Sequence, residues 1–147
     1  MNGPVTAARQ ANRDTSFAMV IAMVKARLRE AAATLKRMHL ERWDYPSQRT
    51  AWWPDVVRSA LDSYPDEKTK TTRAAPDGAA IDRMEEVLRW LLWMEDDDHR
   101  KLVWARAERI TWRQLETNDG RSRETLRKLY DKALAVIVGK LARERKR

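Results

Sequence analysis

Apolar side chains recur at intervals of three and four residues along several segments of this 147-residue chain. The clearest segment lies between Ile81 and Leu92, and others begin near Phe17, Leu102 and Leu126. This spacing places the apolar side chains on one face of a helix, whereas the alternation typical of half-buried strands is rare. The sequence therefore predicts an all-α fold, and its length suffices for one domain whose core needs neither disulfides nor a metal.

The periodic segments and the connections between them predict the order of the helices. The expected helices are Thr15–Met38, a short helix after Pro54, Ala80–Met94, Asp98–Glu108, Thr111–Thr117 and Ser122–Leu141. Residues 1–14 show no helical period and are interpreted as a flexible arm. We therefore expect a helical N-terminal region over residues 15–96, which offers a surface for a partner or for oligomerisation. A C-terminal three-helix region should occupy residues 97–147.

Positive charge is concentrated in the last third of the chain. Residues 97–147 hold 15 Lys/Arg and 8 Asp/Glu, a net charge of +7, whereas residues 1–96 hold 15 and 14, a net charge of +1. The C-terminal run 143–147 is only part of this excess, because residues 97–142 still carry +4. Concentrated positive charge is typical of proteins that bind polyanions, so the C-terminal region is the candidate for binding nucleic acid.

Three local signals in this region predict a helix-turn-helix. Thr111 and Gln114 have the spacing of a capping box, Asn118–Gly120 has turn chemistry, and Ser122 can cap the following helix. In a helix-turn-helix the last helix lies in the major groove, and its first residues reach base edges. Arginine can donate hydrogen bonds to guanine, and glutamate can accept a hydrogen bond from the amino group of cytosine. The candidate residues for binding double-stranded DNA are Arg113, Arg121, Ser122, Arg123, Glu124, Thr125, Arg127 and Lys128.

The segment Ser122–Lys128 (SRETLRK), followed by Lys132–Leu134, resembles the recognition helix of the region 4 domain in primary sigma factors. The resemblance covers about 45 residues at the C-terminus. It implies contact with promoter bases at the positions of Arg123, Glu124 and Lys128.

The chain departs from the sigma motif in its charged residues. Glu116 stands where that motif has a small helix residue, and Asp119 and Arg121 stand where it has apolar turn residues. The resemblance places the position of Arg127 near the DNA backbone. Residues 1–96 resemble no promoter-melting region, so the resemblance to region 4 does not by itself imply a promoter element or polymerase binding.

A looser resemblance extends over the whole chain. The segments Trp53–Arg58, Ile81–Met84, Leu102–Ala107 and Gly120–Arg123 are similar to an uncharacterised family of phages and prophages. Members of that family end in a similar helix-turn-helix. The resemblance implies a protein of the cytoplasm of a bacterial or phage-infected host cell.

Other classes of function find little support in the sequence. Glu95–Asp98 and His99 could suggest a metal site, but no second group of ligands lies at helical spacing, so these acidic residues are interpreted as a helix cap. No phosphate loop and no catalytic triad can be assembled, so we expect neither an enzyme nor a cofactor. The apolar run Phe17–Val24 is too short to cross a membrane.

The seven tryptophans leave two interpretations open. Trp90, Trp93, Trp104 and Trp112 are expected to pack in the interior, and Trp112 is placed near Leu102 and Leu129. Trp43, Trp52 and Trp53 suit either packing or a partner surface.

The function expected from these observations is that of a phage or prophage transcriptional regulator. One alternative is a DNA-packaging subunit similar to a small terminase, which should form a large ring. Another is an adaptor that binds RNA polymerase or another protein through the tryptophan-rich N-terminal half.

Overall fold

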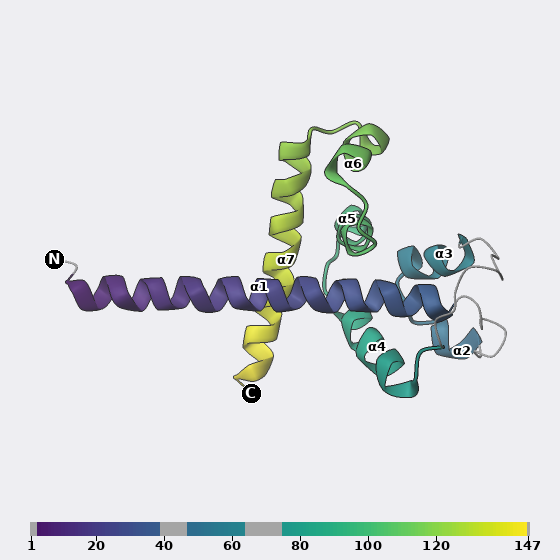
Figure 1. Ribbon diagram of the computed structural model, residues 1–147, viewed down its shortest axis with the longest axis horizontal. Helices are drawn as coiled ribbons and strands as arrows, with labels where there is room; N and C mark the ends of the chain where they lie inside the picture. Colours follow the sequence, from purple (N-terminus) through teal and green to yellow (C-terminus); the bar gives the residue numbers. More distant parts are fainter. Residues whose placement is uncertain (1–2, 39–46, 64–74, 147) are drawn as a thin grey trace.

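The computed structural model describes residues 3–38, 47–63 and 75–146, and every regular element in these ranges is a helix (Figure 1). The prediction of an all-α fold is therefore confirmed. The elements are α1 (Pro4–Met38), α2 (Ser47–Thr50), α3 (Asp55–Ser63), α4 (Gly78–Leu92), α5 (Asp97–Ala107), α6 (Trp112–Asp119) and α7 (Arg123–Arg145). Within the described ranges, no helix is long and apolar enough to cross a membrane.

Helix α1 begins at Pro4, which corrects the expectation that regular structure starts at Thr15. Proline suits the first turn of a helix because the amide hydrogen that it lacks would have no partner there. Residues 7–11 (AARQA) are strong helix formers, and no helix breaker follows them. The first half of α1 projects beyond the other helices and is exposed on all sides, so its helical character leaves no apolar period in the sequence (Figure 1).

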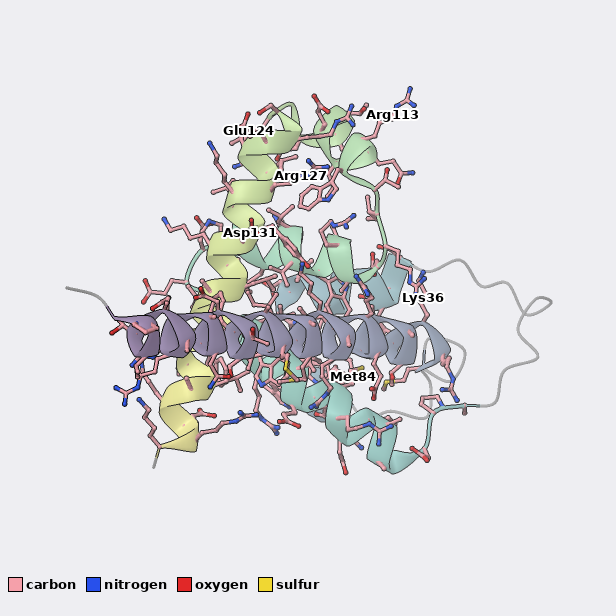
Figure 2. The ribbon with its side chains drawn as sticks, turned by 60° about the vertical axis from the view of Figure 1, so that its left-hand side comes forward. Lys36, Met84, Arg113, Glu124, Arg127 and Asp131 are labelled. Atoms are coloured by element: carbon pink, nitrogen blue, oxygen red, sulfur yellow. The ribbon has the colours of Figure 1, made fainter. Side chains whose placement is uncertain are left out.

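The second half of α1 forms the centre of one continuous core. It packs against α4, α5 and α7, and Figure 2 shows Met84 at the contact between α1 and α4. The core includes Val24, Leu28 and Leu35 of α1, Leu88 and Leu91 of α4, Val103 and Trp104 of α5, and Leu126, Leu134 and Ile137 of α7. The expected boundary between residues 96 and 97 falls in the connection between α4 and α5, and the core continues across it.

A buried carboxylate ties α2 to α4. Glu85 is 8% exposed, and it accepts hydrogen bonds from Nη2 of Arg49 at 2.6 Å and from Nε1 of Trp53 at 3.3 Å. Pairing of this kind offsets the free-energy cost of removing a buried charge from water. Trp53 is therefore a core residue, whereas Trp52 is half-buried beneath the guanidinium of Arg89. Trp43 lies outside the described residues.

Helix α7 crosses α1, so its two ends lie on opposite sides of that helix (Figure 1). Its 23 residues correspond to a length of roughly 35 Å at 1.5 Å per residue. The N-terminal end lies on the same side as α5 and α6 (Figure 1). The basic residues Arg143, Arg145 and Lys146 lie at the other end, so the positive charge of the C-terminal region is divided between two separate places.

Candidate nucleic-acid interface

Helix α6 is fixed at both ends although it buries no side chain. At its start, Oγ1 of Thr111 accepts from the amide of Gln114 at 3.2 Å, and Oε1 of Gln114 accepts from the amide of Thr111 at 3.1 Å. This confirms the predicted capping box. At its end, Gly120 has a φ of 88° and donates its amide to the carbonyl of Glu116 at 2.9 Å. Glycine suits this left-handed position because a side chain would be strained there.

Trp112 attaches α6 to its neighbours. The guanidinium of Arg106 lies 4.4 Å from the centre of the indole and that of Arg127 lies 5.6 Å from it, while Tyr130 meets it edge-on at 5.5 Å. Figure 2 shows Arg127 between α7 and α6. Trp112 packs against the hydrophobic core between α5 and α7, as expected, but it is only half-buried and its ring also contacts two guanidinium groups and Tyr130. Its expected position near Leu102 and Leu129 stays a prediction.

The turn between α6 and α7 is held by an ion pair. Arg121 donates Nε and Nη2 to the two carboxylate oxygens of Asp119, at 2.6 and 2.8 Å. Its backbone amide donates to the same carboxylate at 3.2 Å. These hydrogen bonds, of which the side-chain bond from Arg121 is the strongest cause, lower the pKa of Asp119 below its ordinary value. The carboxylate of Asp119 therefore stays ionised, and the pair charged, at more acidic pH than for an aspartate without such a partner.

Ser122 caps α7 as the sequence predicts. Its Oγ accepts from the amide of Thr125 at 3.2 Å and lies 3.0 Å from the hydroxyl of Thr125. The two hydroxyl groups therefore hydrogen-bond to each other, and the hydroxyl of Ser122 also accepts from a backbone amide in the first turn of the helix. Ser122 and Thr125 were expected to contact DNA. In the structure, their side chains fix the start of α7.

The remaining charged candidates on α7 are exposed and paired. Arg123 donates Nε to Oε2 of Glu116 at 2.6 Å, which joins α7 to α6. Nζ of Lys128 lies 3.3 Å from Oε1 of Glu124, and both side chains are more than three-quarters exposed. An exposed pair of this type contributes little to stability and can separate readily when a ligand approaches.

Arg113 is a candidate outside these pairs. It lies on the outer side of α6 (Figure 2) and makes no ion pair with any described residue. Together with Ile110, Gln114, Thr117 and Asn118 it lines a shallow hollow of about 400 Å³. An exposed guanidinium beside such a hollow can bind a phosphate group.

The structure brings all the candidate residues to one end of the molecule, on α6, the following turn and the first two turns of α7. It also reveals partners that sequence reasoning missed. Glu116 and Asp119 are visible in the sequence only as departures from the sigma motif, yet they pair with Arg123 and Arg121. An acidic residue in place of a small or apolar one, a few residues before an arginine, is the signal that could have indicated both pairs.

The acidic run before α5 acts as a cap, as interpreted from the sequence. Oδ1 of Asp96 accepts from the amide of Asp98 at 2.9 Å, and Oδ2 lies 3.7 Å from Nε2 of His99. Among the described residues, no group of three or more potential ligands could hold a metal ion.

Comparison with known proteins gives one match. No curated protein and no solved structure matches the chain. The model of a family described as a domain of unknown function, DUF6362, matches residues 36–137, which is 102 of the 147 residues. The matched segment begins near the end of α1 and ends within α7, so it contains every element of the candidate interface. The chain therefore belongs to the DUF6362 family.

Proposed function

We propose that this protein binds double-stranded DNA in a sequence-specific manner through a helix-turn-helix formed by α5, α6 and α7. In this proposal the first turns of α7 enter the major groove, and α6 lies across the phosphate backbone. A major groove about 12 Å wide admits one helix. The proposal is based chiefly on one observation: α6 and the start of α7 form an exposed unit whose turn and caps are fixed by hydrogen bonds.

The distribution of side chains supports the same function. Arg123, Glu124 and Lys128 are exposed at the end of α7 that would meet DNA. Arg113 on the outer face of α6 is available for a phosphate. The opposite end of α7 lies beyond α1 (Figure 1), so Arg143, Arg145 and Lys146 are about a helix length away from this surface.

The biological role that we propose is regulation of transcription in a phage or prophage. The resemblance of Ser122–Lys128 to the recognition helix of sigma region 4 supports a role in transcription, and the looser resemblance of the whole chain to an uncharacterised phage and prophage family supports the origin. The two departures at Asp119 and Arg121 are compatible with this proposal because the two residues neutralise each other within the turn.

Selection of bound sequences from a random pool of duplex DNA tests the function. The full chain should enrich one short site. Arg123→Ala should then relax the preference at one base pair, with a loss of about 1–3 kcal/mol on the selected site and less on scrambled DNA.

Arg143→Ala is the matched control, because it removes the same charge from the far end of α7. Both variants are measured on selected and scrambled DNA over a salt series. If Arg123→Ala and Arg143→Ala weaken the two DNAs by the same factor, α7 attracts DNA only as a basic surface. Enrichment of no site would contradict the proposal altogether.

A further inference from the structure

Two arginines flank Ser122, and their guanidinium groups are engaged differently. Arg121 uses both Nε and Nη2 to bind Asp119, at 2.6 and 2.8 Å. Arg123 donates Nε alone to Glu116, at 2.6 Å. A guanidinium has five N–H donors on three nitrogens. Among the described residues, both terminal nitrogens of Arg123 therefore remain free, whereas one side of the Arg121 group is already occupied.

We infer that Glu116 is a positioning residue that holds Arg123 ready to recognise one base pair, an inference that rests on the proposed binding of duplex DNA. The carboxylate holds Nε, so the two terminal nitrogens form the edge that can face a base. Guanine presents O6 and N7 to such an edge in the major groove.

The position of Glu116 suits this role because the carboxylate comes from a different helix. It lies on α6, seven residues before Arg123, and α6 is fixed by the capping box and by Gly120. A long arginine side chain loses rotamer freedom when it binds a base. A partner that restricts it beforehand reduces that loss and so favours the correct base.

Stability alone explains this pair poorly. The side chains of Arg123 and Glu116 are 53% and 40% exposed, and exposed ion pairs contribute little to folding. A carboxylate near the phosphates also weakens attraction to DNA of any sequence. Glu116 should therefore lower general affinity while it raises discrimination, and this combination can be measured.

The experiment uses the full chain, a selected site and single-base variants of that site. Glu116→Ala removes the acceptor, and alanine keeps the helix propensity of α6. Asp131→Ala is the matched control, since Asp131 is exposed, lies further along α7 (Figure 2) and carries the same charge. Arg123→Ala identifies the base pair that Arg123 recognises.

Both carboxylate variants should bind scrambled DNA more tightly. Only Glu116→Ala should lose discrimination, by roughly 3- to 10-fold and at the base pair identified by Arg123→Ala. Glu116→Gln should recover part of it because the amide oxygen can still accept from Nε. In the double variant with Arg123→Ala, removing Glu116 should cause no further loss at that base pair.

Other results would overturn the inference in distinguishable ways. If Glu116→Ala behaves as Asp131→Ala does while Arg123→Ala loses discrimination, the DNA-binding function stands and the positioning role is wrong. If Glu116→Ala lowers discrimination equally at all base pairs, its role is to support α6, and the positioning role is again wrong. If the full chain selects no site, the proposed function fails and the inference fails with it.

Discussion

Helices α5 and α6 follow each other in the chain and both lie against α7, but they are held in different ways. Helix α5 buries Leu102, Val103, Trp104 and Ala107, whereas α6 buries no side chain. The tryptophan of α5, Trp104, is 1% exposed. The tryptophan of α6, Trp112, is half-buried between two guanidinium groups. The comparison shows that α5 belongs to the core and that α6 packs on its outside, so we expect α6 to open without unfolding the rest.

The largest effect should come from Trp104→Ala. Removing a fully buried tryptophan leaves a cavity at the contact of α5 with the core, so the free energy of unfolding should fall by about 3–5 kcal/mol. Denaturant unfolding followed by circular dichroism would measure the change. A loss below about 1 kcal/mol would show that α5 is no better anchored than α6.

Trp112→Ala should have a smaller and more local effect. Each cation–π contact with Arg106 or Arg127 contributes about 0.5–1 kcal/mol and the edge-on contact with Tyr130 about 0.5–1.5 kcal/mol, so a total loss of about 2–3 kcal/mol is expected. Hydrogen exchange should quicken at the amides of α6 while those of α4 stay protected. Trp112→Phe should retain part of the protection because it keeps an aromatic face. Equal deprotection of α4 and α6 would contradict the comparison.

Gly120→Ala tests the end of α6. The φ of 88° is unfavourable for alanine, and a Cβ added there meets no atom within 4 Å, so the cost of about 1 kcal/mol comes from the backbone alone. The Tm from thermal unfolding should fall accordingly, and α6 amides should exchange faster. An unchanged Tm together with unchanged exchange would mean that α6 does not depend on this turn.

Arg109→Gly tests the end of α5 and should have the opposite sign. Arg109 has a φ of 66°, and the amide of Ile110 donates to the carbonyl of Ala105 at 3.1 Å in a Schellman motif, where glycine is preferred. The free energy gained by relieving the backbone strain slightly exceeds the cost of the greater conformational entropy of the unfolded chain. The variant should therefore be about 0.5 kcal/mol more stable. Denaturant unfolding of Arg109→Gly and Gly120→Ala, measured in parallel, compares the ends of α5 and α6. A destabilised Arg109→Gly variant would show that the Arg109 side chain supports the connection between α5 and α6.

The sequence predicted those elements whose signals are local. The start of α7 follows from Ser122, and the start of α6 follows from Thr111 and Gln114, because caps act within one turn of helix. Helix α4 follows from the period of its apolar residues. The first half of α1 could not be predicted in this way, since a helix that faces solvent on every side needs no apolar stripe.

The candidate site itself stays a prediction. Its residues could be proposed because they cluster around one turn, but the ion pairs among them could not be predicted. The bond between Arg123 and Glu116 depends on the angle between α6 and α7, and the position of Trp112 depends on the neighbouring Arg106 as well. These relations arise from tertiary packing, which spacing along the chain does not specify.

The absence of buried side chains on α6 has a consequence for how such proteins evolve. A substitution at an exposed position of α6 or of the first turns of α7 removes no buried side chain, so selection for a stable fold acts weakly there, whereas Trp112 and Leu115 of α6 pack against the core. Binding preference can therefore change through single exposed residues while the arrangement of α1, α4, α5 and α7 is maintained. Related chains are expected to diverge first at these positions, and a coordinated exchange of residues 116 and 123 would be the mark of a new preference.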